Sequence, residues 1–280
     1  MVVVNGFTFM LARPWRAEEG PPSCRLSATS TMFDLGRARK GAVLIAAVLA
    51  GLLLTACDES MNARYNRETV EVMRRVMRPD STGVDVGAYI GELLEPMVEI
   101  APKGRHYAFE PQVEHARALA RRFPGVLVFD FALGETRGRQ SFVLALDAPA
   151  RSGFKRREYP PGEDRTRDMT VEVRRLDDIV PATAPVAFIK VDVEGGEFLV
   201  LRGARATIAR HRPVIVFEFG LGSAEGYGST PERVWDFMQG ALGLRLWLMS
   251  DWLEGRPPLS SDDFRAQFYG RSNYMFLAAP

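Results

Sequence analysis

The sequence predicts an α/β fold built on a mostly parallel sheet, and three observations support this prediction. Apolar, β-branched segments alternate with amphipathic segments between residues 82 and 129, as parallel strands joined by helices require. Acidic residues stand at the ends of successive predicted strands. Residues 188–197, FIKVDVEGGE, predict a buried central strand that ends in a tight acidic turn. Open α/β sheets place their ligands at this end of the strands.

Composition limits the classes of function. The chain has 280 residues, a net charge of +1 and 46% hydrophobic residues, which is typical of a globular protein with no general attraction to nucleic acid. Cys24 and Cys57 both precede residue 60, so the rest of the chain has no disulfide framework and no thiolate metal site. The spacing of the three histidines matches no metal motif. We therefore predict no nucleic-acid partner and no metal.

Residues 1–60 are predicted to be a leader that precedes the folded domain. A basic cluster at 37–40 is followed by the uncharged apolar run 41–54 and by small residues before Cys57, which is the layout of an export signal. The LTAC ending resembles a bacterial lipoprotein lipobox. The run is shorter than the roughly 20 residues that span a bilayer, so a short membrane anchor with its basic side in the cytoplasm is an alternative.

The location follows from this leader. We expect a bacterial, membrane-associated protein attached through residues 41–57. If translation instead starts at Met61, the domain 61–280 is cytoplasmic.

The first part of that domain predicts alternating helices and strands. Val70, Met73 and Met77 recur at helical spacing, and Pro79 ends that helix. A second helix contains Pro96, which is tolerated only in a first turn or at a kink. The predicted helices cover 62–77, 93–100 and 113–123, and the predicted strands cover 82–86, 105–110 and 126–129.

The second part predicts a hairpin at 132–146 with Gly138 near its turn, and then a long exposed loop at 147–169. The basic run 155–157 in that loop is either a solvated surface or part of a lid or acidic-substrate contact. Thr230 and Pro231 predict a helix start. Further strands are expected at 171–176, 188–193, 213–219, 244–249 and 274–277, and a helix is expected after residue 197.

The predicted strand ends carry a ligand-binding pattern. Gly87 and Gly91 allow a ligand to approach the backbone at a helix N-terminus, with Asp85 just before them. Two glycines four apart do not make the G-x-G-x-x-G fingerprint, which argues against a dinucleotide. Glu110 ends the second strand and is placed to accept two ribose hydroxyls. Asp130 follows the third strand, where an acid can accept an adenine amino group.

Several motifs together resemble the FkbM family of S-adenosylmethionine-dependent methyltransferases. They are DVGA from Asp85, FEP at 109–111, ALG at 132–134, LDD at 176–178 and IKVDVEG at 189–195. The resemblance runs from about residue 68 to residue 280. It implies a Rossmann-like, seven-stranded, mostly parallel sheet with an antiparallel last strand, the class I methyltransferase fold.

The resemblance also implies site residues. Asp85, Gly87 and Gly91 would line the methionine end of the cofactor, Glu110 the ribose and Asp130 the adenine. The cofactor-binding set is completed by Ala88, Pro111, Phe131 and Asp192. The chain departs from the family at Gly196, where members usually have a histidine.

The expected reaction is methyl transfer to a hydroxyl oxygen of a small molecule or glycan. The hydroxyl must lose its proton, so we expect Asp192 and Glu194 to be the catalytic residues. In the alternative, Asp192 only orients the cofactor's amino group and Glu194 only stabilises the start of the next helix. Asp192 and Glu218 could chelate a cation, but the sequence indicates no third ligand.

A second class of function follows from a conflict within the chain. A signal ending at Cys57 would place the domain outside the cytoplasm, where S-adenosylmethionine is not expected. The alternative is therefore an exported lipoprotein whose methyltransferase-like domain binds a ligand without catalysis. A dinucleotide oxidoreductase is a weaker third reading. The complete cofactor pattern favours catalysis in the cytoplasm or on its membrane face.

Overall fold

The computed structural model describes residues 2–4, 7–9, 60–157, 159 and 162–280. The chain divides into two units, Met1–Cys57 and Asp58–Pro280. In the first unit, β1 (Val2–Val4) pairs antiparallel with β2 (Phe7–Phe9). The predicted signal at 41–57, with Cys57, lies outside the described residues. Among the residues that are described, no helix is both long and apolar enough to cross a membrane.

The second unit is built on a seven-stranded sheet, counted over the described residues, with the order β11-β12-β10-β9-β3-β4-β5. β12 runs antiparallel to both of its neighbours, and the pairs from β10 to β5 are parallel. This confirms the predicted sheet, including its antiparallel last strand. The strands are β3 (Thr82–Val86), β4 (Tyr107–Phe109), β5 (Leu127–Phe129), β9 (Val186–Val191), β10 (Val214–Glu218), β11 (Arg245–Leu248) and β12 (Met275–Ala279).

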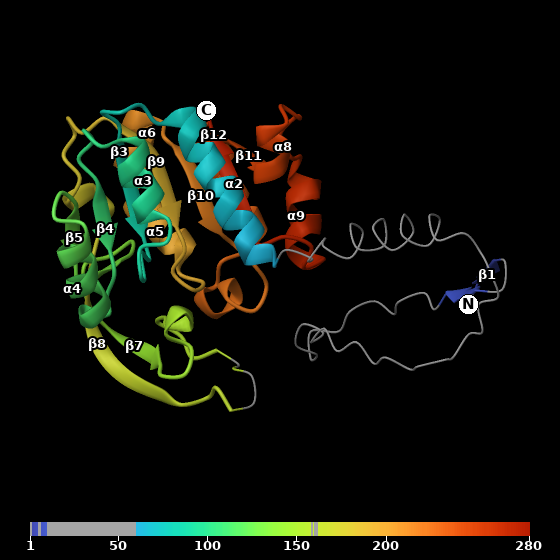
Figure 1. Ribbon diagram of the computed structural model, residues 1–280, viewed down its shortest axis with the longest axis horizontal. Coiled ribbons are helices and arrows are strands. Elements are labelled where there is room, and N and C mark those ends of the chain that lie inside the picture. The colour runs from blue at the N-terminus through green and yellow to red at the C-terminus, as the bar shows by residue number, and fades with distance from the viewer. Residues whose placement is uncertain (1, 5–6, 10–59, 158, 160–161) are drawn as a thin grey trace, which may run out of the picture. The chain divides into compact units, whose positions relative to one another are not determined.

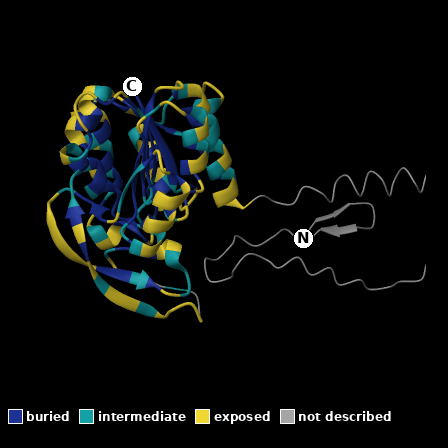
Figure 2. Cartoon of the chain, turned by 60° about the vertical axis from the view of Figure 1, so that its left-hand side comes forward, coloured by how far each residue is buried: buried dark blue, intermediate teal, exposed yellow. Residues whose placement is uncertain are grey.

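Helices cover both faces of this sheet (Figure 1). One face packs against residues such as Met73, Met97 and Leu119, and the other against Phe198 and Phe264. Figure 2 shows the buried strands lying between helices whose outer surfaces are exposed. The helices on the face that contains Met73 are α2 (Met61–Val76), α3 (Leu94–Ile100), α4 (Val113–Arg122) and α8 (Met249–Leu253). The helices on the face that contains Phe198 are α5 (Glu197–Gly203), α6 (Arg205–His211), α7 (Pro231–Trp235) and α9 (Ser261–Tyr269).

Local sequence signals place several of these helices correctly. Met73 and Met77 of the predicted helical face are buried, because they pack α2 against the sheet. Pro96 lies in the first turn of α3, where its missing N–H breaks no helical hydrogen bond. Thr230 caps α7 by accepting a hydrogen bond from the Arg233 N–H, with Pro231 at the first helical position.

The predicted hairpin at 132–146 is wrong. β7 (Gly138–Ala145) pairs antiparallel with β8 (Thr166–Arg174), and β6 (Ala132–Leu133) pairs parallel with β8. Gly138 therefore starts a strand and does not form a turn. The pairing is set by burial, because Phe142 and Val171 pack together in a small core of their own. The intervening residues 146–165 form the connection between β7 and β8, so the exposed loop is shorter than expected.

One buried histidine is held by two backbone groups. The His106 ring accepts a hydrogen bond from the Gly83 N–H at Nδ1 (3.1 Å), and its Nε2 lies 2.8 Å from the Ala101 carbonyl oxygen. The ring is therefore neutral, with its proton on Nε2. Burial lowers the pKa of His106, and these two backbone contacts only partly oppose that shift.

We expect His106 to reduce stability as the pH falls below about 6.5, the ordinary histidine pKa. The unfolded chain binds a proton that the native ring resists, so the free energy of unfolding falls by at most about 1.4 kcal/mol per pH unit from this group. His106→Gln loses hydrogen bonds, but it also removes the pH dependence at this site, because glutamine does not titrate. In urea unfolding, its stability deficit relative to the wild type should shrink between pH 7.5 and pH 5.5. A deficit that stays constant or grows would contradict this assignment.

Candidate active site

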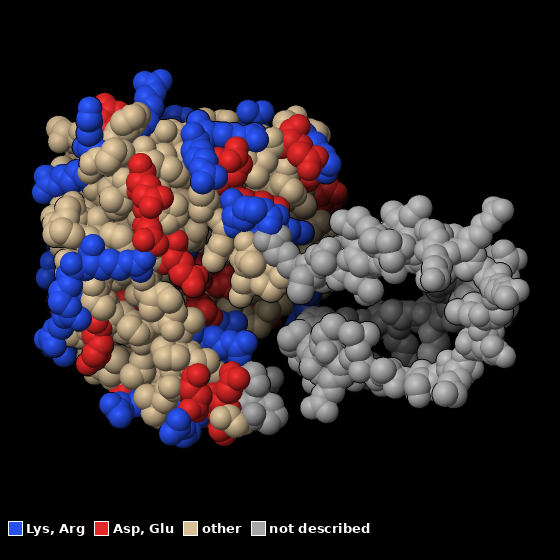
Figure 3. Space-filling view, in the orientation of Figure 1, with Lys and Arg blue, Asp and Glu red and all other residues tan. Residues whose placement is uncertain are grey.

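A cleft lies at the carboxyl ends of β3, β4, β9 and β10. It consists of two adjoining pockets, a larger one of about 340 Å³ and a narrower one of about 50 Å³. Figure 3 shows acidic side chains gathered around the hollow on this face of the molecule. The residues that line both pockets are Gly87, Tyr89, Ala150, Asp192 and Glu194.

The turn after β3 requires its glycines. Gly87 has a φ of +78°, and a Cβ atom there would lie 1.8 Å from the Asp192 carbonyl oxygen. Gly91 has a φ of +85°, and its Cβ would lie 2.8 Å from the Leu119 side chain. Gly87 lines both pockets, and Ala88 lines the larger one. Gly91 lines neither pocket. Because it has no side chain, α4 can pack closely against the turn.

Below this turn, a buried lysine joins two of the predicted site acids. Lys190 Nζ donates a hydrogen bond to the Gly87 carbonyl oxygen (2.8 Å) and lies 3.6 Å from Asp85 Oδ1 and from Asp192 Oδ2. Burial lowers the pKa of Lys190, but the charges of Asp192 and Asp85 outweigh it and raise the pKa overall. Burial raises the pKa of Asp85. The sequence motifs indicated no role for Lys190, although a charged residue inside an apolar strand is unusual.

Glu110 lies in the middle of the cleft, and its carboxylate is fixed by the backbone. Oε2 accepts a hydrogen bond from the Tyr89 N–H (2.9 Å), and Oε1 accepts one from the Gln112 N–H (2.8 Å). Burial raises the pKa of Glu110, and these two donors oppose the rise. A carboxylate has about four acceptor positions, so each oxygen keeps one for a ligand.

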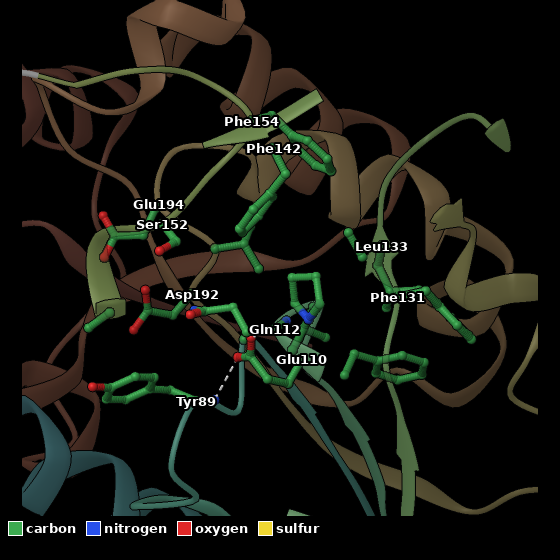
Figure 4. A pocket seen from close by; sticks show the side chains of 17 residues that line it. Tyr89, Glu110, Gln112, Phe131, Leu133, Phe142, Ser152, Phe154, Asp192 and Glu194 are labelled. Atoms are coloured by element: carbon green, nitrogen blue, oxygen red, sulfur yellow. Dashed lines mark hydrogen bonds between the residues drawn. The ribbon is translucent and has the colours of Figure 1, made fainter. Parts of the chain in front are cut away.

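The two ends of the narrower pocket differ in chemistry. In Figure 4, Phe131 and Leu133 lie at one end, Asp192 and Glu194 lie at the other, and Glu110 lies between them. The apolar end suits a flat aromatic group. Further large apolar residues that line this pocket are Phe109, Pro111, Phe142 and Phe154.

Asp130 is the one predicted cofactor acid that the structure does not bring to the cleft. It is exposed, and it lines neither pocket. Its neighbour Phe131 is buried and lines the narrower pocket. A hydrogen bond from Asp130 to adenine therefore remains a prediction.

The acidic end brings three carboxylates together. One oxygen each from Asp192, Glu194 and Glu218 lies within 4.8 Å of the others. Glu194 has a φ of +63°, a left-handed conformation that is uncommon for a residue other than glycine and clusters at functional sites. Arg157, from the basic run in the β7–β8 connection, forms an ion pair with Glu194. Burial raises the pKa of Glu218 well above its ordinary value, and the charges of Asp192 and Glu197 add to the rise.

The buried Glu197 side chain binds the backbone of this turn. Its Oε1 accepts hydrogen bonds from the Val193 and Gly195 N–H groups, both at 2.9 Å. Burial raises the pKa of Glu197 to about 7. Gly195 is required beside it, because a Cβ there would lie 2.4 Å from the Ser223 carbonyl oxygen.

Gly196, where the family usually has a histidine, is buried. The Tyr227 ring packs beside it, so this end of the turn is closed off from solvent. A Cβ at Gly196 would make an ordinary contact with the Tyr227 ring at 3.6 Å. The rest of an imidazole would need that ring to move.

The larger pocket has a wall that the motifs did not indicate. It is formed by α2 and by the residues at the start of β12, including Asn62, Tyr65 and Tyr274. Tyr65 Oη donates a hydrogen bond to Asn273 Oδ1 (2.5 Å), and Tyr274 Oη contacts Asn62 Oδ1. The only sequence signal was the polar face of the predicted helix 62–77, which is also typical of a solvated surface.

The strand order, the antiparallel β12 and the cleft at the strand ends define a class I methyltransferase fold. A family model, the Methyltransferase FkbM domain, matches residues 85–245, which is more than half of the chain. The chain belongs to this family of methyltransferases. A comparison with curated proteins found no match.

Solved structures show distant similarity. Methyltransferase FkbM from Methylobacillus flagellatus KT is 19% identical, with a TM-score of 0.45 over 72% of this chain. This chain spans 44% of the length of that protein, less than half. A SAM dependent methyltransferase from Aquifex aeolicus is 13% identical, with a TM-score of 0.36, over 76% of this chain and 87% of that one.

Proposed function

We propose that this methyltransferase uses S-adenosylmethionine and methylates a hydroxyl oxygen of a small molecule or glycan. The observation that carries the cofactor assignment is the Glu110 carboxylate, buried in the cleft and held by two backbone N–H groups. It stands between an apolar end and an acidic end. That order suits a ligand made of a flat base, a ribose and a cationic tail.

The residues of the cleft fit this cofactor. Glu110 would accept the ribose hydroxyls with its two remaining acceptor positions. Gly87 allows the turn to pack against the Asp192 carbonyl oxygen, and it lines both pockets, so a ligand can approach the backbone there. The apolar end would enclose the base. When bound, S-adenosylmethionine supplies an electrophilic methyl group on a sulfonium.

The acidic end would handle the acceptor. We propose that the Asp192 and Glu194 carboxylates orient the hydroxyl group and that one of them takes its proton. Asp192 lines both pockets beside Lys190, so it would also position the cofactor. Glu194 lies further from the apolar end (Figure 4), so we propose that it acts mainly on the acceptor.

Replacing Glu110 tests the cofactor assignment. We expect Glu110→Gln to weaken S-adenosylmethionine binding by about 1.5–3 kcal/mol, the range for hydrogen bonds to a charged group. Calorimetry on the full chain measures this. Glu114→Gln, an exposed change in the first turn of α4, is the matched control and should bind like the wild type. Tighter binding of NAD than of S-adenosylmethionine by the wild type would refute the assignment.

Membrane attachment through residues 41–57 is a separate proposal that rests on the sequence alone. If LTAC is a lipobox, a fatty-acid analogue supplied to cells should label the protein at Cys57. Cys57→Ser should abolish the label. A natural protein that starts at Met61 and stays in the soluble fraction would contradict the proposal.

A further inference from the structure

We propose that Asp192, Glu194 and Glu218 bind one hard divalent cation at the acidic end of the cleft. Binding of the ion does not depend on the proposed acceptor chemistry. Only its role toward the acceptor rests on the proposed function.

The geometry suits such an ion. The three carboxylates each offer one oxygen, and these oxygens all lie within 4.8 Å of one another. Oxygens on opposite sides of Ca²⁺ are about 4.6–5.2 Å apart, and those around Mg²⁺ are at most about 4.2 Å apart. The three oxygens are therefore close enough to share one ion after a small inward shift, which is smaller for Ca²⁺ than for Mg²⁺. A donor set made only of carboxylate oxygens selects hard cations over softer ones.

Glu218 supplies a second, independent observation. Its Oε2 atom is buried and accepts no hydrogen bond from the described residues. Arg157, the basic group that attracts this carboxylate, forms its ion pair with Glu194 instead. Its close neighbours at this end of the cleft are the carboxylates of Asp192 and Glu194. A buried carboxylate normally has a donor or a cation, because leaving it without one is costly.

The nearby basic groups leave this end of the cleft negative. Arg157 pairs with Glu194, and Lys190 is shared between Asp85 and Asp192. Neither forms an ion pair with Glu218 among the described residues. A divalent cation would supply the missing positive charge.

The fold holds the three acids in place. Phe217 of β10 is paired with Val191 of β9 in the parallel register, so Glu218 and Asp192 are the next residues on neighbouring strands. Glu194 is brought back to the same point by its left-handed backbone conformation. Two of the three ligands therefore belong to the central sheet, which favours a precise ion site.

The ion would select the class of acceptor. Its remaining coordination positions face the larger pocket, which Glu218, Asp192 and Glu194 all line. Acceptors with two adjacent oxygens, such as a sugar diol or a hydroxy acid, could chelate it. A bound cation lowers the pKa of a coordinated hydroxyl. A carboxylate that binds through one oxygen keeps the other free to take the proton.

The test is titration of the chelator-treated full chain with Mn²⁺, Mg²⁺ and Ca²⁺, followed by calorimetry and, for Mn²⁺, by electron paramagnetic resonance. We expect one site per chain, and Mn²⁺ binding weakened at least tenfold in Glu218→Gln. Glu92→Gln is the matched control, because Glu92 lines the same pocket outside the cluster. It should bind Mn²⁺ within twofold of the wild type.

Thermal unfolding is a second measurement, and it also shows whether each variant still folds. The wild type and Glu92→Gln should be stabilised by Mn²⁺, whereas Glu218→Gln and Asp192→Asn should melt cooperatively with a smaller shift at the same Mn²⁺ concentration. The proposal is overturned if the wild type binds none of the three ions up to about 10 mM, above the weakest class of protein calcium sites. It is also overturned if Glu218→Gln binds Mn²⁺ like the wild type. Binding of S-adenosylmethionine without metal tests the proposed function separately.

Discussion

Replacing Lys190 with methionine is expected to lower the free energy of unfolding by about 3–5 kcal/mol, the range for removing one partner of a buried ion pair. Lys190 is 6% exposed and Asp85 is 1% exposed. Asp85 Oδ1 accepts no hydrogen bond from the described residues, so the ammonium 3.6 Å away is its compensating charge. Methionine keeps the length of the side chain and removes that charge. Urea unfolding at pH 7 measures the loss.

The double variant Lys190→Met/Asp85→Asn is the matched control. It removes the buried carboxylate as well, so it should recover a large part of the lost stability. In Lys190→Met alone, the Asp85 pKa, already raised by burial, should rise further. The native state then binds more protons than the unfolded state, so the deficit of this variant should shrink as the pH falls. A double variant as unstable as the single one would show that Lys190 acts through packing alone.

Glu194→Gln is expected to lower turnover by about 10²-fold or more while leaving S-adenosylmethionine affinity nearly unchanged. The reason is position, because Glu194 lies at the acidic end, away from Glu110 and the apolar residues. Asp192→Asn should reduce both turnover and cofactor affinity, since Asp192 borders both pockets and lies beside Lys190. Cofactor titration, together with turnover on an acceptor that the wild type methylates, separates the two effects.

Both assays should be run with excess Mg²⁺, so that weaker ion binding is not mistaken for the loss of a base. Glu232→Gln, which changes an acid on the outer helix α7, is a suitable control and should turn over like the wild type. If Glu194→Gln turns over normally, Glu194 only shapes the turn before α5 and the base lies elsewhere. If Asp192→Asn binds S-adenosylmethionine and reacts like the wild type, the end of β9 has only a structural role.

The main sheet could be predicted because its signals are local. Apolar strands, amphipathic helices and caps such as Thr230 depend on neighbouring residues, and parallel strands put their carboxyl ends at one edge. That rule was enough to bring Asp85, Glu110 and Asp192 to one cleft. It could not place Asp130, because the side chain of a residue at a strand end can point into the cleft or into solvent.

The parts that were missed depend on contacts distant in sequence. The partner of β7 lies beyond a long connection, and no turn signal indicates that distance. The third carboxylate beside Asp192 and Glu218 required the backbone conformation of Glu194, which its residue type does not favour. Gly196 is buried beside Tyr227, a residue 31 positions further along the chain.

The wall of the larger pocket formed by α2 and the start of β12 has a consequence for engineering. Asn62 and Tyr274 touch each other across that wall, yet both lie outside residues 85–245, the part that the family model matches. The residues proposed to bind the cofactor and the ion all lie within 85–245. The two terminal segments therefore supply a part of the acceptor pocket that could be exchanged between relatives, with the acidic end and the catalytic motifs left untouched.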